Sequence, residues 1–316
     1  MNLLRPVKLA PVFKDYLWGG EKLRTVYGKP TTLSPLAESW ELSAHKDGES
    51  TVIGGAFDGY TLSAYVEVAG KEILGTRAEG LDRFPILVKL IDAKGDLSVQ
   101  VHPSDAYALE HEGEFGKTEM WYILDCDEGA ALYYGFSKDV TREELAKAIA
   151  SETLTDLLLR VPVKRGDVFF IPAGTVHAIG AGIVICEIQQ NSNTTYRVYD
   201  YGRRDKDGNL RPLHVDRALD VATLSPAPIR EALPEGTDVL LASCEYFTSR
   251  RVTVTDRVFL SATEESFHTL TVTEGSGSIV SPHGTVALLR GETAFIPAGH
   301  GEYTLEGAFT AILTTL

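Results

Sequence analysis

The sequence predicts an all-β protein built from two similar units, with only minor helices. Short segments rich in β-branched and aromatic residues recur along the chain, separated by Gly, Pro and Asp. Such segments are typical of a sandwich or a barrel. The phrase "RGDVFFIPAGTVHAIGAG" (165–182) returns as "RGETAFIPAGHGEYTLEG" (290–307), with eight of 18 positions identical. A repeat of this kind indicates a duplicated β unit, one in each half of the chain.

The predicted strands are distributed over both halves of the chain. Each is short, β-branched and bounded by turn residues, which is the pattern expected of antiparallel sheets. They lie at 84–91, 97–102, 119–124, 167–172, 182–188, 239–244, 247–255, 268–274, 286–290 and 309–316.

One region has a helical pattern. In "TREELAKAIASETLTDLLLR" (141–160), Thr141 and Glu144 have the spacing of a capping box. Leu145 and Ile149 are four residues apart, and three further leucines continue the apolar face. We therefore expect a helix over about 141–160, and a shorter helix that begins near Ser104.

The boundary between the two units is predicted at a proline-rich stretch. "LSPAPIREALPEGT" (224–237) contains three prolines and reads as a linker. Residues 1–223 would form the first unit with an N-terminal extension, and residues 224–316 would form the linker and the second unit.

Composition excludes several classes of function. The 316 residues carry a formal net charge of −14, whereas nucleic-acid binders usually present a basic face. No apolar run approaches the roughly 18 residues of a membrane helix, and the N-terminus lacks a signal-peptide pattern. The three cysteines are sparse and widely spaced, which favours reduced thiols. We expect a cytoplasmic protein without nucleic-acid or membrane partners.

The repeat draws attention to His177. When the two copies are aligned at their constant offset of 125 residues, His177 falls opposite Glu302. A purely structural histidine would have less reason to be missing from the second copy. The comparison favours a special role for His177 in the first unit only.

Four residues of the first unit could form a metal site. Gln100 and His102 share one face of the predicted strand 97–102, because alternate residues of a strand point the same way. Glu119 follows on the next predicted strand, and His177 comes after a Pro/Gly turn. Each residue alone could be solvated or structural. Together they supply two imidazoles, a carboxylate and an amide, as cupin barrels do, and this set suits Zn²⁺ or Fe(II).

The sequence resembles a known family, the type I phosphomannose isomerases, in their short bacterial form. The resemblance covers roughly residues 1–220, and the C-terminal third is similar only as a second cupin-like unit. The matching phrases are "YLWGG" (16–20), "ESWELSAH" (38–45), "FPILVKLIDAKGDLSVQVHP" (84–103), "GKTEMWYI" (116–123), "IPAGTVHAIG" (171–180) and "NTTYRVYDYGR" (193–203).

The resemblance implies two cupin-type jelly-roll units and a zinc-dependent aldose–ketose isomerase of carbohydrate metabolism. The family interconverts mannose 6-phosphate and fructose 6-phosphate through a cis-enediol. The implied ligands of one Zn²⁺ per chain are Gln100, His102, Glu119 and His177. The other implied site residues are Arg197, Lys117 and Glu187 for catalysis, and Ser98, Lys89, Arg203 and Trp18 for the substrate and its phosphate.

The chemistry is compatible with these residue types. A metal ion can polarise the carbonyl, and a base must take the C2 proton. Glu187 lies in the apolar run "IVICEIQQ", so we expect burial to raise its pKa. The expected partner is a small sugar phosphate, with the chain a monomer or a homodimer.

Two alternatives stay open. An Fe(II) cupin oxygenase could use the same metal ligands, and would not need a phosphate site. A non-catalytic sugar-phosphate-binding protein could hold a structural metal, although structural zinc sites are usually closed by four protein ligands.

Overall fold

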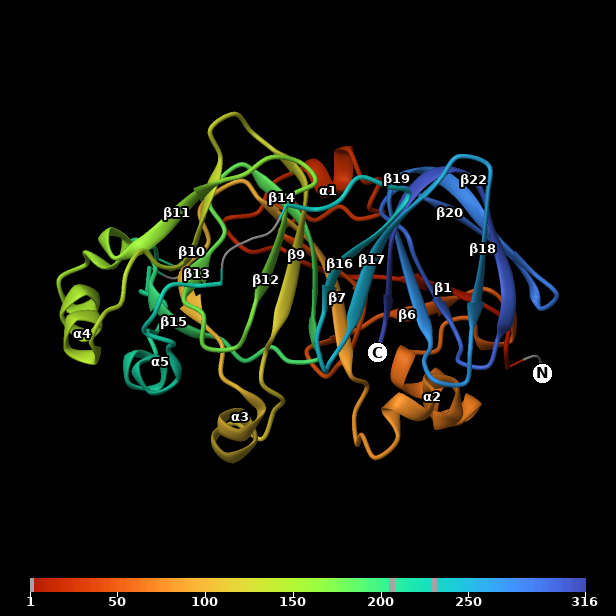
Figure 1. Cartoon of the computed structure of the whole chain (residues 1–316), viewed down its shortest axis with the longest axis horizontal. Coiled ribbons are helices and arrows are strands. Elements are labelled where there is room, and N and C mark those ends of the chain that lie inside the picture. The colour runs from red at the N-terminus through yellow and green to blue at the C-terminus, as the bar shows by residue number, and fades with distance from the viewer. Residues whose placement is uncertain (1–2, 205–207, 229–231) are drawn as a thin grey trace.

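The computed structural model describes residues 3–204, 208–228 and 232–316. Strands dominate these residues, and they form two β units that lie side by side in Figure 1. The all-β prediction is confirmed, and all ten predicted strands are present. Two of them are much longer than predicted: the strand expected at 268–274 continues to Ser281, and the strand expected at 309–316 begins at Gly301. No helix among the described residues is long and apolar enough to cross a membrane.

The first unit consists of two antiparallel sheets. One has the order β12 (Val168–Ile171), β9 (Glu119–Cys126), β14 (Ile183–Gln190), β7 (Ile86–Ala93), β3 (Glu38–Leu42) and β2 (Val12–Lys14). The other has the order β11 (Leu158–Pro162), β10 (Ala131–Phe136), β13 (His177–Ala178), β8 (Val99–Val101) and β15 (Tyr196–Tyr199). Buried side chains from both sheets form a shared core cluster, among them Trp121, Ile123 and Leu132. The sheets therefore pack face to face, as in a sandwich.

The sheet of the second unit includes strands from the N-terminal extension. Its order is β16 (Asp238–Ser243), β17 (Thr248–Val254), β22 (Gly301–Thr315), β19 (His268–Ser281), β21 (Thr293–Ile296), β1 (Val7–Ala10) and β6 (Thr51–Ile53). Two more strands join it, β18 (Arg257–Ala262) on β22 and β20 (Gly284–Leu289) on β19. A separate hairpin pairs β4 (Ala44–His45) with β5 (Gly48–Glu49).

The sequence repeat is also a structural repeat. Strands β12 and β21 are equivalent in the two units. Their bounds differ by 125 residues, which is also the offset between the two copies of the sequence repeat. Ile171 of β12 pairs with Glu119, and its counterpart Ile296 of β21 pairs with His268. His268 therefore stands in the second unit where Glu119 stands in the first.

The helices lie outside the sheets (Figure 1). They are α1 (Lys22–Thr25), α2 (Leu62–Ala69), α3 (Asp105–His111), α4 (Arg142–Ala150) and α5 (Val215–Val221). Short 3₁₀ turns follow at Gly55–Phe57, Lys71–Leu74, Thr76–Ala78 and Leu154–Asp156. The helix expected near Ser104 is confirmed as α3.

The predicted helix over 141–160 is only half right. The capping box of Thr141 and Glu144 is present at the start of α4. The helix ends at Ala150, however, and Glu152 has a φ of 58°, a left-handed conformation that a helix cannot continue through. Leu158 then begins strand β11 and pairs with Phe136.

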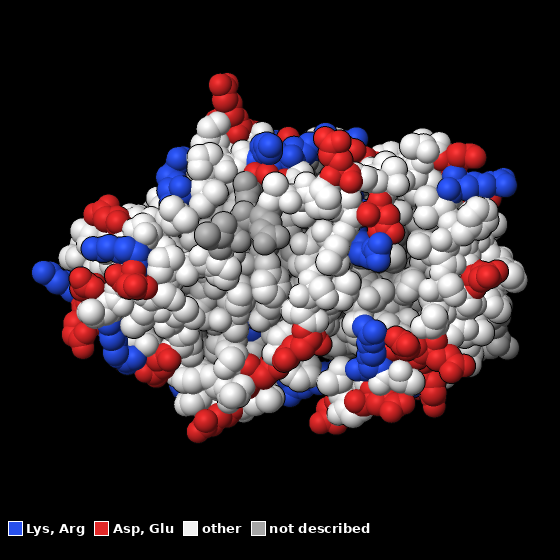
Figure 2. All heavy atoms as spheres, viewed as in Figure 1, with Lys and Arg blue, Asp and Glu red and all other residues white. Residues whose placement is uncertain are grey.

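The stretch 224–237 joins α5 to β16, and residues 229–231 of it lie outside the described residues. Charged side chains lie mostly around the margin of the face shown in Figure 2, and no basic stripe crosses the described part of that face.

Candidate metal centre and catalytic cavity

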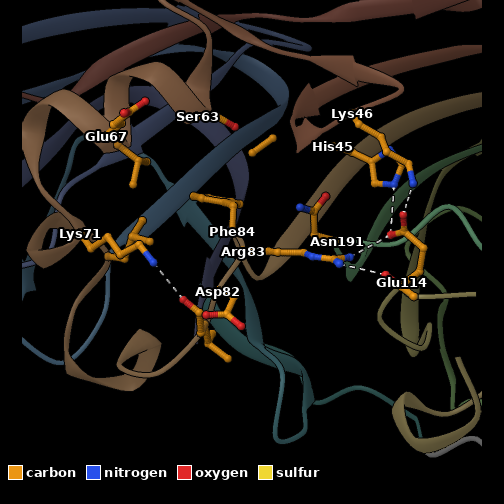
Figure 3. A pocket seen from close by; sticks show the side chains of 15 residues that line it. His45, Lys46, Ser63, Glu67, Lys71, Asp82, Arg83, Phe84, Glu114 and Asn191 are labelled. Carbon is orange, nitrogen blue, oxygen red and sulfur yellow. Dashed lines mark hydrogen bonds and ion pairs between the residues drawn. The ribbon is translucent and has the colours of Figure 1, made fainter. Parts of the chain in front are cut away.

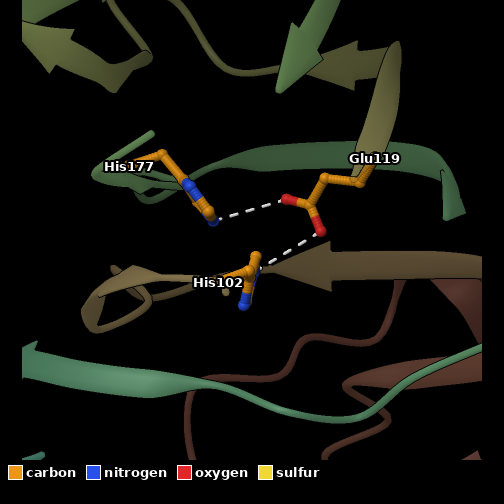
Figure 4. Close-up of side chains that lie close together, drawn as sticks. All are labelled: His102, Glu119 and His177. Carbon is orange, nitrogen blue, oxygen red and sulfur yellow. Dashed lines mark ion pairs between the residues drawn. The ribbon is translucent and has the colours of Figure 1, made fainter. Parts of the chain in front are cut away.

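Three potential metal ligands meet between the two sheets of the first unit (Figure 4). His102 follows β8, Glu119 begins β9, and His177 begins β13. One ligand atom of each lies within 4.8 Å of the others, and all three side chains are buried. Glu119 Oε2 is 3.5 Å from His102 Nε2, and Glu119 Oε1 is 3.3 Å from His177 Nε2. Residues 75 positions apart in the chain thus converge on one point.

Backbone carbonyls fix the orientation of both histidines. His102 Nδ1 is 2.9 Å from the Thr194 oxygen, and His177 Nδ1 is 2.8 Å from the Thr175 oxygen. Because a carbonyl only accepts, each Nδ1 carries the proton and each Nε2 keeps a lone pair. The His102 lone pair accepts from Lys117 Nζ over 3.2 Å, and both Nε2 atoms lie close to Glu119. Burial lowers the pKa of His177 to about 4 and that of His102 well below its usual value. Both rings are therefore neutral at neutral pH, as metal ligands must be.

Glu119 supplies the test of whether a cation fits. Its Oε2 forms an ion pair with Lys117 Nζ over 2.7 Å, and Oε1 has no hydrogen-bond partner among the described residues. Burial raises the pKa of Glu119 despite that neighbour. A carboxylate left in this state is costly, and a divalent cation held with the two imidazoles would satisfy it. The residues therefore fit a metal ion.

Gln100 also reaches the cluster. It is the ladder partner of His177, and its Nε2 lies 3.3 Å from His177 Nε2. In this orientation the amide donates a hydrogen bond to the imidazole. To act as the predicted ligand, the amide must turn and present its oxygen.

A cavity of about 210 Å³ adjoins the cluster. Its walls come from both sheets and from the N-terminal segment. Most of the predicted site residues lie on these walls, namely Trp18, Lys89, Ser98, Gln100, Lys117, Glu187 and Arg197.

Opposite charges alternate along one wall of the cavity. Lys117 Nζ is 3.9 Å from Glu187 Oε1, and Lys89 Nζ is 3.4 Å from Glu187 Oε2. Trp121 donates its indole N–H to Glu187 over 2.9 Å. The predicted rise in the pKa of Glu187 is wrong: burial does raise it, but Lys117, Lys89 and the Trp121 hydrogen bond outweigh burial and lower the pKa. Glu187 is thus an ionised carboxylate at neutral pH.

The cavity has a second, arginine-bearing wall. Arg197 Nε donates to Ser98 Oγ over 3.3 Å. Arg211 also lines the cavity, and its Nε donates to Asp200 over 2.7 Å. Arg203 does not line the cavity, contrary to its expected place at the phosphate. Its guanidinium is held by Asp200 and by the backbone oxygen of Asp96.

Sequence reasoning missed two charged residues of the cavity, Glu38 and Arg211. Arg211 is not among the predicted site residues, and its place on the cavity wall is evident only from the structure, where it pairs with Asp200. Glu38 also lines the cavity, accepts the indole N–H of Trp40 over 2.7 Å and lies 3.9 Å from Lys89. The acidic residue of "ESWELSAH" was the available signal for Glu38.

Fold and site together define a class: a protein of two β units, of which the first carries a candidate metal centre that opens on a charged cavity. Comparison with known proteins identifies the family. Residues 7–128 match the family model of the phosphomannose isomerase type I catalytic domain, and residues 237–316 match that of the mannose-6-phosphate isomerase cupin domain.

Full-length relatives agree with both matches. The chain is 41% identical to the mannose-6-phosphate isomerase ManA of Bacillus subtilis, over 98% of this chain and 99% of that protein. It is 39% identical to the mannose-6-phosphate isomerase of Streptococcus mutans, over 93% of each chain. The crystal structure of a mannose 6-phosphate isomerase from Bacillus subtilis superposes with a TM-score of 0.90 at 38% identity, over 99% of this chain and all of that one. The chain belongs to the type I phosphomannose isomerase family, and the expected cupin fold is confirmed.

Proposed function

We propose that the protein interconverts mannose 6-phosphate and fructose 6-phosphate through a cis-enediol, with one Zn²⁺ held by His102, Glu119, His177 and Gln100. The observation that carries this proposal is the placing of a buried carboxylate and two oriented imidazoles beside a cavity lined with acid–base groups and arginines. The names of the full-length relatives support the same reaction. Zinc is favoured over iron by this family membership, since the donor set alone suits both.

A bound divalent cation would supply stabilisation of negative charge on the substrate oxygens. The remaining work falls to residues of the cavity. Glu187 is ionised and can take the C2 proton and return it to C1. Its ion pairs with Lys89 and Lys117 make it a weaker base than a buried carboxylate alone. Lys117, between Glu119 and Glu187, can donate a hydrogen bond to a substrate oxygen.

The arginine-bearing wall is the proposed phosphate site. Arg197, Arg211 and Ser98 place two guanidinium groups and a hydroxyl on one side of the cavity. Guanidinium groups suit a phosphate because they can donate to two of its oxygens at once. Arg203 would act only indirectly, by sharing Asp200 with Arg211. We expect the chain to act as a monomer or a homodimer, since every group of the proposed site comes from one chain.

A coupled assay on mannose 6-phosphate, scoring fructose 6-phosphate, tests the proposal. The protein would be assayed as purified, after chelation and after addition of Zn²⁺. Loss on chelation and recovery with zinc would support the isomerase and its metal together. Absence of turnover in every zinc-loaded sample would overturn the proposal. Oxygen uptake with Fe(II) would then identify an oxygenase, and binding without turnover a non-catalytic module.

A further inference from the structure

A second, larger cavity lies apart from the catalytic one. It has a volume of about 590 Å³, within the roughly 300–1,000 Å³ of typical small-molecule sites. It opens between α2, the turn that follows it, the hairpin β4–β5 and the loop after α3 (Figure 3). None of the residues that line the catalytic cavity lines this one. Val66, Leu74, Leu81 and Phe84 give it an apolar surface.

The charges around this cavity balance. Three cationic and three acidic side chains line it: Lys46, Lys71, Arg83, Glu67, Asp82 and Glu114. Some of them are already paired, since Glu114 contacts Lys46 and lies 3.4 Å from Arg83. A site with equal numbers of both signs does not favour a strongly charged ligand.

Two buried polar atoms on the wall have no hydrogen-bond partner among the described residues. His45 Nδ1 accepts the Asp47 backbone N–H over 3.1 Å, so Nε2 carries the ring proton of neutral His45. That Nε2 is unpartnered, and Glu114 Oε2 lies 3.7 Å away, beyond hydrogen-bonding distance. Asn191 Oδ1 is likewise unpartnered, and both side chains are only 4% exposed.

His45 thus offers an unused donor and Asn191 an unused acceptor, and Figure 3 shows both on the same side of the cavity. Both atoms are buried in the wall, and hydroxyl groups that reached them could accept from His45 and donate to Asn191. The lysines, arginine and carboxylates around them add further donors and acceptors, while Phe84 and its apolar neighbours can cover the C–H face of a ring.

We propose that this cavity binds an uncharged, polyhydroxylated ring compound of the class of an unphosphorylated hexose. The site is separate from the catalytic cavity and does not depend on the reaction proposed for it. The lack of net charge in the lining argues against a phosphorylated sugar, whereas the catalytic cavity has two arginines for that group.

Trp40 lies between one lining residue of each cavity. The His45 ring lies edge-on to Trp40, with 6.0 Å between centroids, and Lys89 Nζ lies 5.0 Å over the same Trp40 ring. Asn193 on the catalytic side donates to Asp47 over 2.8 Å. Contacts through Trp40 thus connect His45 of the second cavity to Lys89 of the catalytic one.

The test uses methyl α-D-mannopyranoside, whose locked ring cannot open or isomerise. Saturation-transfer NMR would detect its binding to the full-length protein, with and without saturating mannose 6-phosphate. Glu67→Trp places a bulky ring at the cavity wall. Val68→Trp is the matched control, because Val68 is the next residue of α2, is 56% exposed and does not line the cavity.

The expected result is a signal that persists with mannose 6-phosphate, is lost in Glu67→Trp and is kept in Val68→Trp. A signal abolished by mannose 6-phosphate would place the sugar in the catalytic cavity and overturn the proposal. A signal that survives in Glu67→Trp, or is lost in both variants, or is absent from the unmodified protein, would overturn it as well. The comparison of the two variants stands even if mannose 6-phosphate proves not to be a substrate.

Discussion

Two carboxylates of the first unit show how environment divides roles between like residues. Glu119 and Glu187 are both buried and both lie near Lys117. Burial dominates at Glu119 and raises its pKa, whereas Lys117, Lys89 and Trp121 together lower the pKa of Glu187. Carboxylates whose pKa values are pushed apart in this way are candidates for different chemical tasks. Glu119 lies beside the two imidazoles and is suited to hold a cation, whereas Glu187 lines the cavity, stays ionised at neutral pH and can accept a proton, although its lowered pKa makes it a weak base.

Replacing Glu187 by Gln should remove the proposed base and keep the shape of the cavity. We expect kcat to fall by about 10²–10⁴-fold, the usual contribution of a general base. Metal content should not change, because Glu187 is not among the three clustered ligands. Steady-state kinetics and metal analysis measure both quantities. A kcat close to that of the unmodified enzyme would assign the base elsewhere.

The two neighbouring arginines should differ in their effect on substrate binding. Arg211→Ala should raise KM for mannose 6-phosphate by about 10- to 100-fold, since a charge-assisted hydrogen bond contributes about 1.5–3 kcal/mol. Arg203→Ala should change KM much less, because Arg203 does not line the cavity. Kinetics of the two variants side by side decide between them. A larger rise in KM for Arg203→Ala would contradict this and would indicate that Arg203 binds the phosphate, as expected from the sequence.

Residue-level prediction from spacing expected His102, Glu119 and His177 at one place, and the structure brings them together, while their role as metal ligands stays a prediction. The face shared by Gln100 and His102 and the turn before His177 lead to the cluster that the structure shows. It failed where partners come from distant strands. The pKa of Glu187 depends on Lys89 of β7 and on Lys117, and nothing in its own segment reveals them.

At the scale of elements, the Pro/Gly turn before β13 connects the segment of His177 to that of His102 by a backbone hydrogen bond. Gly174 donates its backbone N–H to the His102 oxygen over 2.8 Å. It has a φ of 90°, and a Cβ there would lie 2.6 Å from Thr223 Oγ1. Its counterpart Gly299 also has a positive φ, of 73°, but a Cβ there would meet only Glu264 Cγ, at 3.8 Å. The two copies of the turn thus share the left-handed conformation but differ in the space available for a side chain.

Alanine substitutions at Gly174 and Gly299 should distinguish the cost of a left-handed backbone conformation from the cost of a steric clash. Gly299→Ala should cost about 1–2 kcal/mol of unfolding free energy, the cost of a left-handed residue with a side chain. Gly174→Ala should cost more, because a contact under 3 Å must be relieved, and it should weaken metal binding by moving His177. Urea unfolding and zinc titration measure both effects. Equal costs and unchanged zinc affinity would contradict the proposed role of the turn.

The helix over 141–160 shows the limit of prediction for elements. The capping box identified the start, because it depends only on local spacing. The end was missed because Leu154 and Leu158 fit the helical period, while both are buried in a core shared with β8 and β15. Tertiary packing decides that Leu158 belongs to a strand.

At the scale of the whole molecule, the second unit keeps the fold of the first with different chemistry. His268 stands at the position of Glu119, and its Nδ1 lies 2.7 Å from Tyr303 Oη. Strands β1 and β6 complete its sheet, a pairing between chain ends that sequence periodicity could not predict. The repeat alone showed that two units exist.

His268 should make stability depend on pH. Burial lowers its pKa to about 4 from an ordinary 6.5. Below pH 6.5 His268 binds a proton in the unfolded chain but stays neutral in the folded protein. The free energy of unfolding therefore falls as the pH drops from 6.5 towards 4. Between pH 7 and pH 5 the contribution amounts to about 2 kcal/mol. Urea unfolding of His268→Gln should show a pH dependence reduced by that amount, and an unchanged slope would refute the assignment.

The central claim is that a metal ion held by the first unit alone supports the isomerisation, and the repeat provides its control. His177→Ala removes a ligand, and Glu302→Ala changes the aligned position on the exposed surface of the second unit. The decisive measurement is bound zinc per chain together with isomerase activity on mannose 6-phosphate for both variants. We expect His177→Ala to lose zinc and activity together, and Glu302→Ala to keep both. Full activity in a zinc-free His177→Ala protein would contradict the account.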